Sequence, residues 1–125
     1  MAESARMDVP LSVESPRSAR GFVTDQMQRW GYAPIASDAA LVTSELVTNA
    51  VQHASEPFAL EIVDLHNGVV VTVEDAGNEL PLPRNPGPAV MGGRGLFIVD
   101  FIAAAWGAWR IPDAGKFVWF RVAAL

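Results

Sequence analysis

The segment from residue 37 to residue 54 is the strongest constraint on what this chain can fold into. Its apolar residues recur at helical spacing and fill one broad face of the expected helix. These residues are Ala39, Ala40, Leu46, Val47, Ala50, Val51 and Ala54. Ser37 suits the N-cap, and Asp38 in the first turn would interact favourably with the positive end of the helix dipole. A helix with so broad an apolar face needs a second layer to cover it.

A second amphipathic helix is expected before this one. Apolar residues again recur at helical spacing, at Ala19, Val23, Met27 and Trp30. Ser15 could serve as the N-cap, Pro16 is acceptable in the first turn, and Gly31 would end the helix. Residues 1–15 are expected to form a polar lead-in, with a short strand at residues 11–13.

Two β-hairpins follow in the sequence. Residues 58–65 and 69–74 are rich in branched apolar residues, and the turn between them contains the Asn-Gly pair that tight hairpins favour. Residues 106–111 and 117–122, joined by Pro-Asp-Ala-Gly, predict a second hairpin. Each hairpin is expected to be antiparallel.

The segment between the hairpins has a different composition. Proline recurs through residues 78–91, which excludes regular structure there, and so long a loop in a small domain usually has a function. Residues 92–95 are rich in glycine and open an apolar segment, 96–104, which we expect to be a helix.

The order of these elements predicts the fold class. Two helices, a hairpin, a long loop, a third helix and a second hairpin suggest an α+β protein, a two-layer sandwich. Its sheet would be mixed and mostly antiparallel, with the helices on one face. The length of 125 residues suits one domain, which we place at residues 16–125.

Composition excludes several classes of function. Nine basic against 14 acidic residues give a net charge of −5, the wrong sign for a protein that mainly binds nucleic acid. The absence of cysteine excludes disulfides, thiol nucleophiles and zinc-thiolate sites, and two histidines are too few for a histidine-rich metal site. No apolar run is long enough to span a membrane, and the first residues do not resemble a secretory signal, so we expect a cytoplasmic protein.

Glu45 and Asn49 are the first candidate site residues. Four positions apart on a helix, they lie about 40° apart around its axis and away from the main apolar face. A solvated helix face is one explanation for the pair. The alternative is a Mg²⁺ site, because this cation accepts one or two protein oxygens while phosphates and water complete its shell. A neighbouring carboxylate could then act as a base on an attacking hydroxyl.

Asp75 and Gly77 follow the second predicted strand. A carboxylate at this strand end could accept a hydrogen bond from a ligand amine, and the glycine would permit close approach of the backbone. An ordinary Asp-x-Gly turn explains the same residues equally simply.

Gly93, Arg94 and Gly95 open the third predicted helix. Glycine lets backbone N–H groups turn toward an anion, and the positive end of a helix favours phosphate. A flexible connector is the alternative interpretation. The Walker A pattern is absent because Lys116 is followed by Phe117 and not by serine or threonine.

The three elements in this order resemble a known family. Glu-x-x-x-Asn on a helix, Asp-x-Gly after a strand and Gly-x-Gly opening a helix are similar to the ATP-binding domain of type II topoisomerases, heat-shock chaperones, histidine kinases and MutL. This domain is called the GHKL or Bergerat fold. The run at residues 45–54 looks most like the bacterial anti-sigma-factor serine/threonine kinases, and the likeness extends from about residue 16 to residue 120.

The resemblance implies roles for individual residues. It implies that Asn49 ligates Mg²⁺, that Glu45 is the catalytic base, and that Asp75 binds the adenine amino group of ATP. Gly77 would make room for the adenine ring. Residues 78–91 would form a lid over the nucleotide.

The resemblance extends to the phosphates and to a protein partner. Gly93 and Gly95 would cradle the phosphates, and Arg20 matches an arginine on the partner-binding surface of the family. Arg94 as a phosphate contact is inferred from its charge and position alone. An exposed helix arginine explains Arg20 equally well.

Two positions depart from the family pattern. Many relatives continue Asp-x-Gly with a second glycine, where this chain has Glu79, so the base of the lid would be stiffer or differently placed. Many also have threonine near the adenine in the last strand, where this chain has Phe117. Both departures predict weaker binding of nucleotide.

Two functions follow as hypotheses. The first is a cytoplasmic, homodimeric ATP-dependent serine/threonine kinase that phosphorylates an anti-sigma factor antagonist and sequesters a sigma factor. The second is a non-catalytic ATP-binding module that sequesters a partner. Neither involves direct contact with nucleic acid or membrane. A histidine kinase is disfavoured, since neither histidine heads a dimerisation helix.

Overall fold

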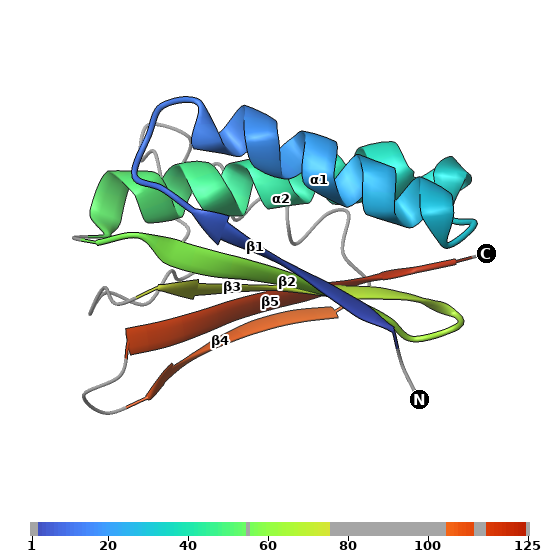
Figure 1. The fold of residues 1–125 in the computed structure, drawn as a ribbon. Helices are drawn as coiled ribbons and strands as arrows, with labels where there is room; N and C mark the ends of the chain where they lie inside the picture. The colour runs from blue at the N-terminus through green and yellow to red at the C-terminus, as the bar shows by residue number, and fades with distance from the viewer. Residues whose placement is uncertain (1–2, 55, 76–104, 112–114, 125) are drawn as a thin grey trace, which may run out of the picture.

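The computed structural model describes residues 3–54, 56–75, 105–111 and 115–124, which form two helices and one sheet (Figure 1). The elements in chain order are β1 (Ser4–Val9), α1 (Ser15–Arg29), α2 (Ala33–His53), β2 (Phe58–Asp64), β3 (Gly68–Asp75), β4 (Ala105–Ile111) and β5 (Gly115–Ala123). The predicted lid at residues 78–91 and the predicted helix at 96–104 lie outside the described residues.

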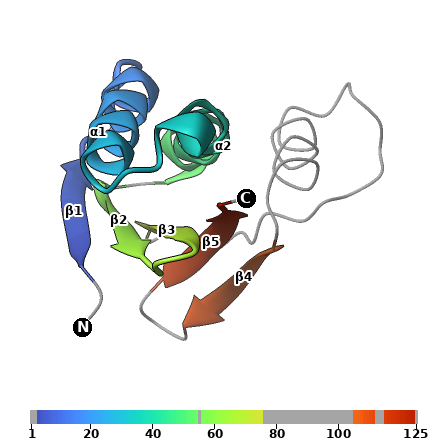
Figure 2. The same cartoon turned by 90° about the vertical axis from the view of Figure 1, so that its right-hand side faces the viewer.

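The five strands form one sheet in the order β1-β2-β3-β5-β4, with every pairing antiparallel. Both described helices cover the same face of this sheet (Figures 1 and 2). Helix α1 packs against β1, whereas α2 packs against β3 and β5. The prediction of a two-layer α+β sandwich with helices on one face is therefore confirmed, and the described sheet is antiparallel throughout where a mixed, mostly antiparallel one was expected.

The two helices begin elsewhere than the sequence suggested. Ser15 is the first residue of α1 and not its N-cap, and its buried hydroxyl donates a 2.6 Å hydrogen bond to the carbonyl of Pro10. Helix α2 begins at Ala33, four residues before the expected cap at Ser37. The cause is the turn at Gly31, whose φ of +87° reverses the chain early, and Pro34 suits the first turn that follows.

The first strand also lies elsewhere than expected. The sequence suggested a strand at residues 11–13, but the structure places it at Ser4–Val9, paired with β2 from Ser4 opposite Val63 to Val9 opposite Phe58. The signal was present as an alternation of exposed polar residues with more buried apolar ones. Residues assigned to the polar lead-in thus supply one edge of the sheet.

The β2–β3 hairpin depends on Gly68. Its φ is +148°, and a Cβ at this position would collide with the backbone of Val122 in β5. The Leu65 N–H donates to the Gly68 carbonyl at 2.9 Å, and the Ala124 N–H donates to the Asn67 carbonyl at 2.9 Å. The turn that the sequence predicted therefore also fixes the end of the last strand.

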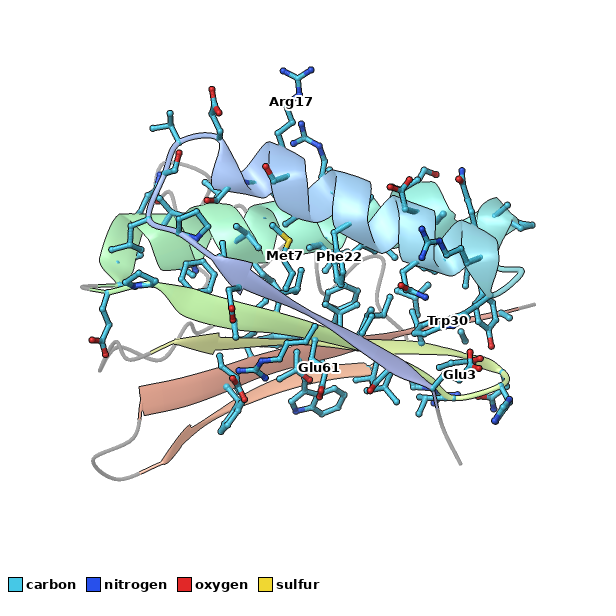
Figure 3. The ribbon with its side chains drawn as sticks, in the orientation of Figure 1. Glu3, Met7, Arg17, Phe22, Trp30 and Glu61 are labelled. Carbon is cyan, nitrogen blue, oxygen red and sulfur yellow. The ribbon has the colours of Figure 1, made fainter. Side chains whose placement is uncertain are left out.

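The core lies between the sheet and the helices. Its largest fully buried side chains include Met27 of α1 and Leu60, Ile62 and Phe120 of the sheet. Figure 3 shows Met7 and Phe22 between the layers and Glu61 on the uncovered face. No helix in the described part of the chain combines the length and the apolarity needed to cross a membrane.

Candidate functional site

Helix α2 carries both polar residues of the predicted cation site. Glu45 and Asn49 are half-buried and border the broad buried face that α2 packs against the sheet and α1. Their four-residue separation puts them on neighbouring turns of one side of the helix. Among the described residues, neither side chain has a hydrogen-bond or ion-pair partner. Their oxygens are therefore not engaged by the rest of this part of the fold.

Ser44 provides a reference direction that shows on which side of α2 Glu45 and Asn49 lie. The Arg20 guanidinium on α1 donates to the Ser44 hydroxyl at 2.9 Å, so Ser44 faces α1. At about 100° per residue, Glu45 and Asn49 lie about 100° and 140° further around the helix. Both therefore lie on the side of α2 that faces away from α1.

Asp75 lies at the same end of the molecule as the C-terminal half of α2. Helix α2 ends at His53, β2 begins at Phe58, and Ala59 of β2 pairs with Glu74 of β3, so β3 ends where α2 ends (Figure 1). Asp75 is the last residue of β3 and is opposite Lys116 in the register. The backbone positions of the predicted adenine carboxylate and the predicted cation ligand are thus brought to one end of the fold.

Four predicted site residues lie outside the described residues, namely Gly77, Gly93, Arg94 and Gly95, and their roles remain predictions. Within the described ranges, no group of three or more His, Asp or Glu residues could hold a metal ion. A cation held through Asn49 would therefore need oxygens from a bound phosphate or from water, as Mg²⁺ commonly accepts.

The structure places Phe117 away from the helices. Val118 and Phe120 are buried under the helical layer, and because side chains alternate along a strand, Phe117 lies on the other face. It is paired with Glu74, which forms a 3.0 Å ion pair with Arg6 on that uncovered face. The strand register turns Phe117 away from the face that α2 covers, and its correspondence to an adenine-side threonine stays a prediction.

A buried polar pair that sequence reasoning missed lies at the opposite end of α2. The Tyr32 hydroxyl donates to Asp64 Oδ1 at 2.7 Å, and the His66 N–H donates to the same oxygen at 2.8 Å. These two hydrogen bonds hold the pKa of Asp64 below its usual value, with the Tyr32 bond the larger cause. Burial and the bond to Asp64 raise the pKa of Tyr32. The pair anchors the fold and is remote from Asp75.

Comparison with known proteins identifies the family. Residues 9–122 match the family model of the histidine kinase-like ATPase domain. The chain belongs to this family. A histidine kinase-like ATPase domain is what the sequence motifs suggested, so that prediction is confirmed. Membership implies that the domain binds ATP.

A solved structure shares the fold of this histidine kinase-like ATPase domain. It contains the RsbU and RsbW domains of Rv1364c from Mycobacterium tuberculosis, with a TM-score of 0.73 at 16% sequence identity. The match covers 97% of this chain but only 32% of that one, so the domain spans about a third of that chain. No curated protein sequence matches the domain.

Proposed function

We propose that this histidine kinase-like ATPase domain is an ATP-dependent protein serine/threonine kinase. It would phosphorylate an anti-sigma factor antagonist and sequester a sigma factor, as the resemblance of residues 45–54 to the anti-sigma-factor kinases implies. The observation that carries the proposal is the placement of Glu45 and Asn49 together on α2, at the end of the fold where β3 delivers Asp75.

Each residue has a distinct role in this proposal. Asn49 would hold Mg²⁺, which neutralises charge on the phosphates of ATP, and Glu45 would accept the proton of the attacking hydroxyl. Asp75 would accept a hydrogen bond from the adenine amino group, and Gly77 would give the ring room. Because Glu45 is close to Asn49 on the helix, it would lie beside the phosphates that Asn49 would help to position.

The rest of the site would come from the segment after β3. Gly93 and Gly95 would donate backbone N–H groups to the phosphates, with Arg94 as a cationic contact and residues 78–91 as the lid. Arg20 of α1 lies across α2 from this site and would contact the protein partner. We expect a cytoplasmic homodimer.

Replacing the proposed base tests the kinase function. Glu45→Gln should bind ATP with unchanged affinity but transfer phosphate from labelled ATP to an antagonist protein about 10²- to 10⁴-fold more slowly, because it cannot accept the proton. The control is Asp38→Asn, an exposed acid on the same helix. Transfer by Glu45→Gln at the rate of the unmodified protein would exclude the role of this carboxylate.

A non-catalytic module that binds ATP and sequesters a partner is the second candidate. Glu79, in place of the second glycine of many relatives, is the feature that favours it. The same labelling experiment separates the candidates, since only the kinase puts phosphate on its partner. Comparing ATP with GTP tests the shared nucleotide site, because equal affinities would contradict the adenine role of Asp75.

A further inference from the structure

An ion pair on the uncovered face of the sheet joins β1 to β3 across β2. Arg6 Nη2 donates to Glu74 Oε2 at 3.0 Å. In the strand register Arg6 is opposite Glu61 of β2. Glu74 is opposite Ala59 of the same strand, whose methyl side chain leaves room for the diagonal contact. The ion pair therefore ties the edge strand directly to the strand that carries Asp75.

Arg6 is the only basic residue of β1, β2 and β3. Because side chains alternate along a strand, three carboxylates share its face of the sheet, those of Asp8, Glu61 and Glu74. Arg6 is paired with Glu74, although Glu61 is its partner in the register. Without Arg6, the three carboxylates would repel one another with no cation from these strands among them. Arg6 therefore holds Glu74 in place against a local excess of negative charge.

The restraint acts at the end of β3. Pairing of β3 with β2 ends at Glu74, opposite Ala59. Pairing with β5 continues one residue further, to Asp75 opposite Lys116, so among the described strands Asp75 is held from one side only. A strand end with one paired neighbour opens at a lower free energy than the interior of a sheet. The Arg6 contact therefore restrains the last residue of β3 that has described neighbours on both sides.

We propose that Arg6 and Glu74 are positioning residues for nucleotide binding, which hold the end of β3 so that Asp75 is in place for the adenine amino group. The inference rests on the adenine role that the proposed function gives to Asp75. If the end of β3 is formed in only a fraction of the molecules, the apparent affinity for ATP falls by that fraction. The side chains of Arg6 and Glu74 are 53% and 37% exposed, and an exposed ion pair changes an equilibrium by up to about fivefold. The pair therefore adjusts the affinity of the site and does not create it.

Isothermal titration with two nucleotides tests the proposal. Inosine triphosphate has an oxygen where ATP has the amino group, so it lacks the donor that Asp75 would bind. Arg6→Gln should weaken ATP binding about two- to fivefold and leave the affinity for inosine triphosphate unchanged, whereas a general loss of structure would weaken both alike. An unchanged ratio of the two affinities in Arg6→Gln would overturn the proposal. Equal affinities in the unmodified protein would instead contradict the adenine role of Asp75, and the inference with it.

Glu74→Gln separates the ion pair from long-range electrostatics. ATP is an anion, so the loss of a negative charge from the protein would by itself tighten binding. We expect the opposite, a loss of ATP affinity like that in Arg6→Gln, because either change breaks the same contact. For the same reason, the double variant should lose no more affinity than either single variant. Tighter ATP binding in Glu74→Gln, or additive losses in the double variant, would overturn the proposal.

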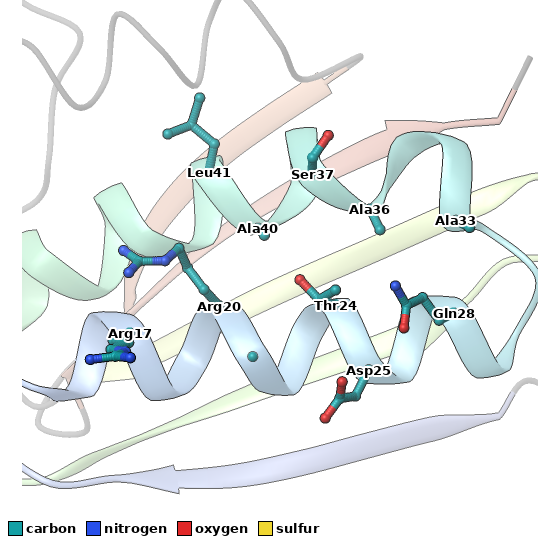
Figure 4. A pocket seen from close by; sticks show the side chains of 11 residues that line it. Arg17, Arg20, Thr24, Asp25, Gln28, Ala33, Ala36, Ser37, Ala40 and Leu41 are labelled. Atoms are coloured by element: carbon teal, nitrogen blue, oxygen red, sulfur yellow. The ribbon is translucent and has the colours of Figure 1, made fainter.

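Two control variants change the charge of the domain without removing either partner of the ion pair. Glu61→Gln removes the carboxylate opposite Arg6 in the register. Arg17→Gln removes an exposed arginine of α1, which lines a groove between the two helices (Figure 4). Neither change should lower the ratio of ATP affinity to inosine triphosphate affinity, and thermal unfolding should show that all the variants are folded. A control that lowered this ratio as much as Arg6→Gln would overturn the assignment to the ion pair.

Discussion

Thr43 is a side chain whose chemistry fits its surroundings poorly. It lies at the centre of the buried face of α2 and is fully buried, yet its hydroxyl has no hydrogen-bond partner within the described ranges. A buried hydroxyl without a partner loses its bonds to water and gains none in return. The Thr43 side chain is therefore polar, while its surroundings offer its hydroxyl no hydrogen-bond partner.

Thr43→Val should therefore stabilise the domain. The two side chains have nearly the same shape, so the change removes the hydroxyl without leaving a cavity, and we expect the free energy of unfolding to rise by about 1 kcal/mol. Urea unfolding should show a higher midpoint with an unchanged slope. Thr48→Val, on the half-buried part of the same helix, is the control and should change little. A loss of stability in Thr43→Val would show that the hydroxyl has a partner.

At the scale of elements, Tyr32 and Asp64 join the turn between the helices to the end of β2. The Asp64 pKa is lowered in the folded state, so its contribution to stability is present above the ordinary pKa of 3.8 and is lost as the pH falls below it. The Tyr32 pKa is raised, so its contribution is present below 10.0 and is lost as the pH rises further. The pair therefore stabilises the fold between these two limits.

Tyr32→Phe tests this link. It should lower the free energy of unfolding at neutral pH and make the remaining stability less sensitive to acid, because the larger cause of the Asp64 shift is gone. Urea unfolding of both proteins between about pH 6 and pH 3 measures the difference. If the free energy of unfolding fell equally with decreasing pH in both proteins, Tyr32 would not perturb Asp64. In an Asp64→Asn background, Tyr32→Phe should no longer change how the free energy of unfolding depends on acidic pH.

The sequence predicted most elements but not all of their boundaries. Both hairpins and both described helices were expected, because branched runs, an Asn-Gly turn and helical periodicity are local signals. Strand β1 was missed because its partner β2 lies about fifty to sixty positions away in the chain, with Val9 opposite Phe58 and Ser4 opposite Val63. The start of α2 was missed because the prediction relied on Ser37 as a cap, whereas the turn at Gly31 starts the helix at Ala33 with Pro34 in its first turn.

At the scale of the whole molecule, the candidate site combines positions on α2 with the end of β3. The motifs indicated Glu45, Asn49 and Asp75 as separate signals, and only the topology brings their positions to one end of the fold. The contact between Arg20 and Ser44 could not be predicted, since it depends on how α1 lies against α2. The orientation of Phe117 likewise follows from strand register and not from composition.

Nucleotide should stabilise the whole domain, and Asn49 should determine how much Mg²⁺ adds. At a hundredfold excess of ATP over its Kd, the free energy of unfolding should rise by about 2.7 kcal/mol. Mg²⁺ should increase the thermal shift further in the unmodified protein, but not in Asn49→Ala, which lacks the oxygen ligand. Gln52→Ala, exposed on the same helix, is the control. If Mg²⁺ still increased the thermal shift in Asn49→Ala, the cation would have to be held by other ligands.

The position of β1 at the edge of the sheet also orders the assembly of the domain in time. Ser4 is paired with Val63, and both described helices lie between these residues in the chain. The first strand to leave the ribosome must therefore wait until β2 has been made, and closing so long a loop is slow compared with forming a local hairpin. We expect the β2–β3 hairpin to act as the template, and β1, although it is made before that hairpin, to be among the last strands to join the sheet.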